Sequence, residues 1–354
     1  MPWSCPAIDH AITFYPNGKV GPCCQISADY LKPKSVINDS NRFSDLKTDH
    51  PPAACKTCIN NEKNNIPSYR QELKLDTGIQ MLDIRNTNLC NLKCRYCGPH
   101  FSDKWAQELG LDQTLTHSDI PLDIITDDLS FLYFTGGEPF LNRDHWAILE
   151  YCVNNLDTSK ITLSYNTNLT TIKYKNINIE DLWSQFKTVL VSCSIDAVGL
   201  PQEYIRSGSD WQTIDANIRK LHQYKNTYIK LSPVISILNI WWLDELYNYA
   251  NELGIAVTPI ILNGPDYLAL DVMPDDLKEQ AQSVLSRIHI TSPRAMPEIE
   301  NMKLLINNNQ NQDLLLHTFS HIMLLDQKRD EKLWDLLPFA KIAQQQVLEN
   351  HEYK

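Results

Sequence analysis

Residues 81–97 read MLDIRNTNLCNLKCRYC, and this stretch decides the fold. The apolar run Met81–Asn86 has strand character and leads directly into three cysteines, Cys90, Cys94 and Cys97. Three thiolates at this spacing can hold three irons of a 4Fe-4S cubane, and no fourth thiolate stands nearby. One iron is then left open to an exchangeable ligand, as catalytic metal sites require. A zinc ion completed by a distant residue is the alternative, and the spacing favours the cluster.

Strand-like runs alternate with helix-like stretches between residues 79 and 264. The runs are Met81–Asn86, Leu129–Thr135, Lys160–Asn166, Lys187–Ile195, Tyr228–Leu238 and Ile255–Leu262. Helical periodicity intervenes at Asp144–Asn154, Trp211–Tyr224 and Leu243–Leu253. This alternation predicts an α/β fold, in which a parallel sheet carries helices on its outside. Active sites of such sheets and barrels lie at the carboxyl ends of the strands, where the cysteine loop is expected.

The pattern divides the chain into three parts. Residues 1–78 are rich in Pro, Asn and Cys, residues 79–264 form the α/β region, and residues 265–354 have helical character. Pro274 followed by two aspartates should open one helix, because proline and acids favour a first turn. Leu314–Leu348 is mostly amphipathic and is expected to pack onto the main domain rather than to bind a membrane or a partner.

Composition excludes several classes of function. The 354 residues include 43 acidic and 32 basic side chains, a net charge of -11, which would repel phosphate backbones. No nucleic-acid partner is therefore expected. The chain starts without a signal peptide and has no apolar run long enough to span a bilayer, so we expect a soluble cytoplasmic protein. In a reducing cytosol its ten cysteines are not a disulfide framework, and eight of them fall in close-spaced sets that indicate metal ligation.

Three features in order resemble the radical S-adenosylmethionine (SAM) superfamily. Its hallmark is a CX3CXΦC loop with an aromatic residue at Φ, and Tyr96 fits this position. Its second motif is present after Thr135 as Gly136, Gly137, Glu138 and Pro139. Glycines allow close approach of the backbone to a ligand. The resemblance spans roughly residues 80–260 and implies a partial (β/α)6 barrel whose Gly-Gly-Glu-Pro segment contacts the amino group of SAM.

Strand alternation adds polar residues to the same pocket. Along Lys187–Ile195 and just beyond, one face carries Ser194 and Asp196, whereas Cys193 falls on the opposite, apolar face. Asn166 shares the polar face of the preceding strand. Polar side chains of a buried parallel strand should face a wet interior, so we expect these three to line the cofactor cavity and Cys193 to lie in the core.

An arginine follows the serine strand. Arg206 stands twelve residues after Ser194, an arrangement similar to the Ser-x-Asp segment and arginine of related enzymes. The resemblance implies that Ser194 and Arg206 bind the SAM carboxylate, and a guanidinium fork suits a carboxylate. A surface ion pair is the alternative for Arg206.

Five further cysteines precede the α/β region: Cys5, Cys23, Cys24, Cys55 and Cys58. Phe14–Cys23 is predicted to form a hairpin with Asn17 and Gly18 at its turn. Cys5, Cys23, Cys55 and Cys58 supply four thiolates, enough to ligate a metal centre completely, and Cys24 could replace Cys23. A zinc knuckle is the alternative to a cluster.

These cysteines resemble the twitch form of the SPASM modules of radical SAM enzymes. The shared features are Cys, then Asn-Gly-x-Val, then Cys, and later a CxxC pair. Twitch modules hold one auxiliary 4Fe-4S cluster. In many members of the family the module follows the barrel, whereas here it precedes the barrel.

The resemblance also implies a reaction. SAM would bind the open iron of the first cluster, and a flavodoxin- or ferredoxin-type donor would supply an electron. The resulting 5'-deoxyadenosyl radical would take a hydrogen atom from a small-molecule, sugar or peptide substrate. An auxiliary cluster could then accept an electron, which makes the net reaction an oxidation, or could ligate the substrate. No separate peptide-recognition domain is evident in the sequence, which weakly favours a small molecule as the substrate.

Two other functions fit parts of the pattern. A non-catalytic iron-sulfur electron-transfer protein would use both clusters, but it has no need of Gly-Gly-Glu-Pro, Ser194 and Arg206. A zinc-stabilised binding protein is the second alternative.

The histidines give weaker signals. His317 and His321 share a helix face but have no third ligand in view, so they are expected to be ordinary helix residues. For His145 and Trp146, lining the pocket and packing in the core are equally compatible with the sequence.

Overall fold

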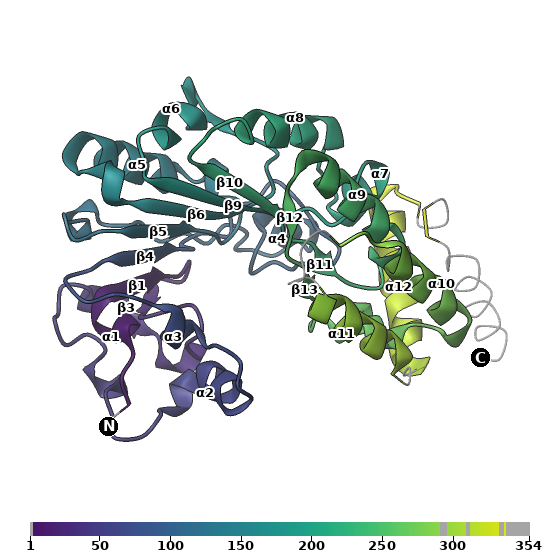
Figure 1. The fold of residues 1–354 in the computed structure, drawn as a ribbon, viewed down its shortest axis with the longest axis horizontal. Coiled ribbons are helices and arrows are strands. Elements are labelled where there is room, and N and C mark those ends of the chain that lie inside the picture. The colour runs from purple at the N-terminus through teal and green to yellow at the C-terminus, as the bar shows by residue number, and fades with distance from the viewer. Residues whose placement is uncertain (1–2, 291–295, 309–311, 333–335, 338–354) are drawn as a thin grey trace.

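The computed structural model of the chain describes residues 3–290, 296–308, 312–332 and 336–337. Its framework is one nine-stranded sheet (Figure 1). In spatial order the strands are β12 (Ala256–Val257), β10 (Thr227–Leu231), β9 (Thr188–Cys193), β6 (Thr162–Thr167), β5 (Phe131–Phe134), β4 (Met81–Ile84), β1 (Ala11–Phe14), β2 (Lys19–Gly21) and β3 (Lys32–Pro33). Neighbours from β12 to β1 run parallel, and the last two pairs are antiparallel. The six strands from β4 to β12 form the predicted partial barrel.

Two of the six predicted strands, β10 and β12, end at least five residues earlier than expected, each just before a proline. Pro233 follows the end of β10 and Pro259 follows the end of β12. Proline has no N–H to donate to the ladder, so the sheet stops there. Beyond the prolines the chain forms β11 (Val234–Ile235) and β13 (Ile260–Ile261), which pair with each other in a separate small sheet.

Helices α5 (Arg143–Asn155), α6 (Ile179–Trp183) and α8 (Trp211–Leu221) cover one face of the sheet (Figure 1). In α8 the buried residues Ile214, Ile218 and Leu221 recur at helical spacing and make the apolar stripe that faces the sheet. The other side of the sheet, away from these three helices, is called the open face below. The N-terminal segment lies at one end of the open face and the C-terminal helices lie at the other (Figure 1).

The N-terminal segment is joined to the barrel through the sheet. The predicted hairpin is confirmed as β1 and β2, with Gly18 at a φ of +74° in the turn. Strand β1 pairs in parallel with β4, and Thr13 is the partner of Asp83. The sheet therefore continues across the predicted boundary at residue 78, and that division remains a prediction.

Three long helices follow the barrel: α10 (Asp275–Arg287), α11 (Met296–Asn307) and α12 (Gln312–Arg329). As expected, α10 begins directly after Pro274. The predicted helix Leu314–Leu348 is shorter, because α12 ends at Arg329, while residues 338–354 lie outside the described part. Buried residues of these helices belong to the same hydrophobic core as the barrel, so they pack onto the main domain. No helix in the described ranges has the length and apolarity to cross a membrane.

Candidate active site

The three cysteines of the triad lie in the loop that follows β4, at the carboxyl edge of the sheet. Cys94 is buried, and Cys90 and Cys97 are partly buried. Burial raises the pKa of all three thiols, to about 12 for Cys94, and neighbouring thiols add to the rise for Cys90 and Cys94. Thiols this hard to ionise become ligands when a bound cation offsets the buried negative charge.

Helix α4 (Asp103–Glu108) supports this loop from behind. The backbone N–H of Cys90 donates to Asp103 Oδ1 at 2.8 Å, and Trp105 Nε1 donates to the carbonyl of Cys94 at 2.8 Å. Both Asp103 and Trp105 are buried. The loop is thus held at two of its cysteines by side chains of one short helix.

The C-terminal helix also reaches the cysteine loop. Arg95 is 1% exposed, and its Nε donates to the carbonyl of Tyr204 at 2.9 Å. Its guanidinium also pairs with Asp326 and Glu331, from the end of α12 and just beyond. Sequence analysis did not anticipate these partners, because nothing local in the sequence connects them to Arg95.

The Gly-Gly-Glu-Pro segment packs directly on the cysteine loop. Gly137 N–H donates to the carbonyl of Thr87 at 3.0 Å, and Glu138 N–H donates to the carbonyl of Leu89 at 2.7 Å. A Cβ at Gly137 would stand 2.1 Å from the Leu89 carbonyl oxygen. Gly136 has a φ of +103°, which disfavours any side chain there. Close approach to the loop backbone therefore requires these glycines, whatever ligand they also admit.

Glu138 ties the same segment to the end of β6. Its carboxylate accepts from Thr167 Oγ1 and from the backbone N–H of Asn168, both at 2.7 Å. Burial raises the pKa of Glu138 to about 7, and these hydrogen bonds oppose the rise. The Asn168 side chain in turn donates to Asn91 in the cysteine loop at 3.1 Å. Pro139, also buried, then opens a short 3-10 turn.

Three predicted cofactor residues meet beside Cys94. Arg206 forms a two-pronged ion pair with Asp196, at 2.8 and 3.1 Å, and Tyr96 Oη donates to the same carboxylate at 2.7 Å. Arg206 Nη1 lies 3.8 Å from Cys94 Sγ. Because Arg206 is only 7% exposed, the alternative of a surface ion pair is wrong. Its role toward the SAM carboxylate remains a prediction.

Ser194 and Asn166 are both half-buried on the open face. The N–H of Ser194 donates to the carbonyl of Thr167 at 2.8 Å, which places Ser194 next to the Glu138 network. Asn166 instead lines a cavity further down the open face, away from the cysteine triad. Cys193 is fully buried in the core, as expected.

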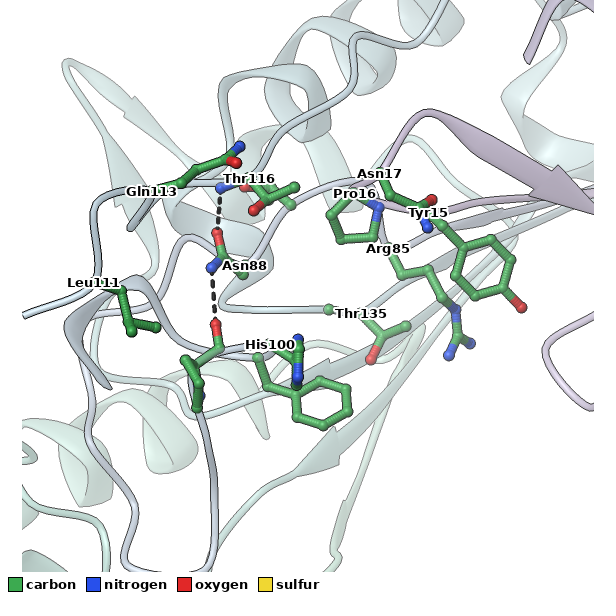
Figure 2. Close-up of a pocket in the computed structure, with 14 residues that line it drawn as sticks. Tyr15, Pro16, Asn17, Arg85, Asn88, His100, Leu111, Gln113, Thr116 and Thr135 are labelled. Atoms are coloured by element: carbon green, nitrogen blue, oxygen red, sulfur yellow. Dashed lines mark hydrogen bonds between the residues drawn. The ribbon is translucent and has the colours of Figure 1, made fainter. Parts of the chain in front are cut away.

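A cavity of about 480 Å³ lies beside Gly136 and the cysteine loop (Figure 2). Its walls include the hairpin turn at residues 15–17, Arg85 and His100. Asn88 anchors one wall, where its Oδ1 accepts from the N–H of Thr116 at 2.7 Å (Figure 2). The cavity is lined by both polar and apolar side chains and adjoins the motif expected to contact SAM. The triad cysteines lie outside its lining.

Four of the N-terminal cysteines line one small cavity: Cys5, Cys23, Cys55 and Cys58. Burial raises the pKa of Cys23 to about 12 and that of Cys55 to about 11, and neighbouring thiols contribute to both shifts. Arg70 also lines this cavity and pairs with Glu62 at 2.6 Å. The structure therefore brings the four predicted ligands together next to a cation.

Cys24 points elsewhere. It lines the larger cavity on the open face and is hydrogen-bonded to Asp83 of β4. Asp83 is held by Arg85 through two hydrogen bonds of 3.0 and 2.7 Å. Asp83 and Arg85 escaped the sequence analysis, although a charged residue inside an apolar strand was a signal for them.

The histidines that the sequence singled out pack against neighbouring aromatic side chains. His145 is fully buried, and its Nε2 lies 3.0 Å from Tyr165 Oη, so core packing is correct and lining the pocket is not. Trp146 is likewise buried. The rings of His317 and His321 pack against Tyr267, at centroid distances of 4.4 and 5.0 Å.

Comparison with known proteins finds a family model that matches part of the chain, and two curated relatives. Residues 84–250 match the model of the radical SAM superfamily. An uncharacterised protein of Methanocaldococcus jannaschii is 26% identical over 236 residues, covering 65% of this chain and 71% of that protein. A probable GTP 3',8-cyclase of the same organism is 26% identical over 231 residues, covering 60% and 71%.

Solved structures are more distant. Histidine-tagged anSMEcpe with bound AdoMet has a TM-score of 0.41 and 20% identity, covering 59% of this chain and 58% of that one. Streptococcus suis SuiB bound to S-adenosylmethionine has a TM-score of 0.38 and 14% identity, covering 66% and 51%. The chain thus spans less than two thirds of either structure.

Proposed function

As this chain is an enzyme of the radical SAM superfamily, with its family domain at residues 84–250, we propose that Cys90, Cys94 and Cys97 hold its 4Fe-4S cluster. When bound, the cluster and SAM would supply a 5'-deoxyadenosyl radical that takes a hydrogen atom from the substrate. One observation carries the assignment. The backbone of Gly137 and Glu138 is hydrogen-bonded to the cysteine loop, so the motif expected to contact SAM adjoins the three thiols.

The sequence spacing of Cys90, Cys94 and Cys97, with no fourth thiol in the same loop, supports a cluster over a single zinc ion.

Arg206, Asp196 and Tyr96 are proposed to orient SAM at the open iron. Asp196 holds the guanidinium by two of its nitrogens and leaves Nη1 directed at the cluster loop. A guanidinium fixed in this way can receive a carboxylate with little loss of side-chain entropy. Ser194 lies next to the Glu138 network, two positions before Asp196 in the chain, and adds a hydroxyl. This arrangement supports the binding role inferred from the resemblance.

Cys5, Cys23, Cys55 and Cys58 are proposed to hold an auxiliary 4Fe-4S cluster. Four thiolates complete the ligation, so this site needs no SAM. Arg70 lies beside this cavity and lowers the pKa of the Cys5 thiol, which burial raises overall, and the pairing of Arg70 with Glu62 limits how much of the thiolate charge it can offset. This cluster would accept the electron when the substrate radical is oxidised.

The reaction partners follow as proposals. A flavodoxin- or ferredoxin-type protein would reduce the first cluster. The substrate would be a small molecule or a peptide that enters the open face, where polar residues of β6, β9 and β10 line a cavity of about 560 Å³. Cavities of this size typically enclose a small molecule.

The test is cleavage of SAM by anaerobically reconstituted protein. With SAM and dithionite, the wild type should release 5'-deoxyadenosine, and Cys94→Ala should release none. Cys152→Ala is the matched control, because Cys152 is a buried cysteine of α5 outside both sites, and this variant should keep its activity. Full activity in Cys94→Ala would overturn the assignment.

A further inference from the structure

A row of polar side chains crosses the open face below the proposed SAM site. Asn166 on β6 is the register partner of Ser192 on β9, and Ser192 is the partner of Lys230 on β10. Register partners in neighbouring strands point to the same face, and such strands lie about 4.8 Å apart, so the row is about 10 Å long. Asn168 and Ser194, near the SAM site, are two positions further toward the carboxyl edge.

All three members of the row line the same cavity, which has a volume of about 560 Å³. In the described part of the chain, the side chains of Asn166 and Ser192 make no hydrogen bond, and no carboxylate pairs with the ammonium of Lys230. By contrast, Arg85 on the same face is neutralised by Asp83. The cavity therefore has one wall with an uncompensated cation and free hydrogen-bond donors.

The ammonium of Lys230 stands out against the net negative charge of the chain. The chain carries eleven more acidic than basic side chains, yet this cavity is lined by two lysines, Lys74 and Lys230, and by only one acidic residue, Glu72. A lysine ammonium acts as a compact charge with three donors. With an amide and a hydroxyl beside it, it matches the several lone pairs of an oxyanion. Lys74 and Glu72 also line the cavity and, like Lys230, are exposed; their opposite charges cancel, so Lys230 gives the lining its net positive charge.

Toward β4, the lining of the cavity is largely apolar. It consists of Tyr69, Leu73 and Leu75 from the segment before β4, together with the first residues of β4 and β5, Met81 and Phe131. These side chains form part of a small hydrophobic cluster with Ala7 and Ala11. A molecule that fills the cavity therefore meets donors at one end and carbon at the other.

We propose that this cavity binds the substrate through an oxyanion, a carboxylate or a phosphate, held by Lys230, Ser192 and Asn166. The apolar part of the same small molecule packs against Tyr69, Leu73 and Phe131. The inference rests on the proposed function, since it assigns the open face to the substrate and the carboxyl edge above it to SAM.

Binding of three model ligands to the reconstituted holoenzyme tests the proposal by titration calorimetry. The probes are 3-phenylpropanoate, phenyl phosphate and the neutral 3-phenylpropanamide. The wild type should bind at least one anion, and should bind it more tightly than the amide. A preference between the two anions identifies the head group as carboxylate or phosphate. Absence of binding by both anions, or equal binding of the amide, would overturn the proposal.

Variants locate the site. Lys230→Met should weaken binding of the anion at least tenfold, and Lys230→Arg should retain it within a few-fold because the charge is kept. Lys225→Met is the matched control, an exposed lysine in the loop between α8 and β10, and should bind the anion as the wild type does. Unchanged anion binding in Lys230→Met would place the site elsewhere and defeat the inference.

The two hypotheses fail separately. Release of 5'-deoxyadenosine by the wild type with SAM and dithionite, without any probe, tests the proposed function alone. If this cleavage occurs but anion binding does not depend on Lys230, the substrate site is wrong and the proposed function stands. If no cleavage occurs, the proposed function fails whatever the probes do.

Discussion

The guanidinium of Arg95 lies 2.7 Å from the carboxylate of Asp326, and this contact joins the cysteine loop to the end of α12. Tyr204 Oη donates to the same aspartate at 2.9 Å, and Glu331 pairs with Arg95 from just beyond the helix. A second contact runs alongside, where Arg329 pairs with Glu108 at 2.7 Å. The C-terminal helix therefore fastens the loop that holds the proposed SAM cluster.

Breaking this contact should destabilise the fold. Asp326→Ala leaves the buried Arg95 with one acidic partner, which should cost about 3 kcal/mol, the lower end of the range for breaking a buried ion pair. Urea unfolding of the apoprotein measures this loss. Asp275→Ala is the control, because Asp275 pairs with Lys278 in an exposed contact worth about 1 kcal/mol or less. Similar losses in the two variants would show that the Arg95 contact adds little.

Removing Arg206 should weaken the binding of SAM. A lost charge-assisted hydrogen bond costs about 1.5–3 kcal/mol, so Arg206→Ala should raise the SAM dissociation constant roughly ten- to hundredfold. Titration of the EPR signal of the reduced cluster with SAM measures this. Arg206→Lys keeps the positive charge opposite Asp196 but loses the two-pronged guanidinium geometry. Its SAM dissociation constant should therefore lie between those of the wild type and Arg206→Ala. Unaltered SAM affinity in the alanine variant would make Arg206 a partner of Asp196 alone.

The two cysteine sets should behave as separate clusters. Alanine at Cys90, Cys94 and Cys97 together should leave one cluster's worth of iron and sulfide, with a spectrum that does not respond to SAM. Alanine at Cys55 and Cys58 should leave the other cluster, whose EPR signal SAM still perturbs, because only an open iron can change ligands. Zinc without sulfide in the first variant would make the N-terminal site a structural knuckle.

Cys24 provides the matched control for this experiment. It adjoins Cys23 in sequence, but it lines the cavity of about 560 Å³ on the open face and is hydrogen-bonded to Asp83. Cys24→Ala should therefore keep the iron and sulfide of both clusters, whereas Cys23→Ala should lose those of the auxiliary cluster. Loss of the auxiliary cluster in Cys24→Ala would show that Cys24 is the ligand.

His145 should make stability depend on pH. Burial lowers its pKa from 6.5 to about 3, so the folded state resists protonation that the unfolded chain accepts. The contribution of neutral His145 to the free energy of unfolding is fully present above about pH 6.5 and is lost as the pH falls toward 3. At pH 5 the free energy of unfolding should be lower by about 2 kcal/mol. Unfolding of the apoprotein at pH 5 and pH 8 should show a pH effect that His145→Gln lacks. The exposed His222→Gln should retain it, and an equal effect in all three proteins would refute the assignment.

Much of the fold could be predicted because its signals are local. The six barrel strands follow from apolar runs of strand length, and the hairpin follows from Asn17 and Gly18, whose backbone preferences select the turn. The triad and Gly-Gly-Glu-Pro could be found for the same reason, since ligand spacing and close backbone approach depend on neighbours in the chain. The early ends of β10 and β12 could have been read from Pro233 and Pro259.

The sequence by itself determined that the chain is an α/β protein with a cysteine loop after its first barrel strand and five more thiols placed before it. Only the tertiary structure decided which distant residues meet. Arg95 pairs with Glu331, 236 positions later in the chain, and Lys230 on β10 lies beside Ser192 on the neighbouring strand β9. It also decided that Cys23 and Cys24, adjacent in sequence, serve different cavities. The physical reason is that strand register and helix packing fix these contacts, and both depend on the burial of surface contributed by the whole chain.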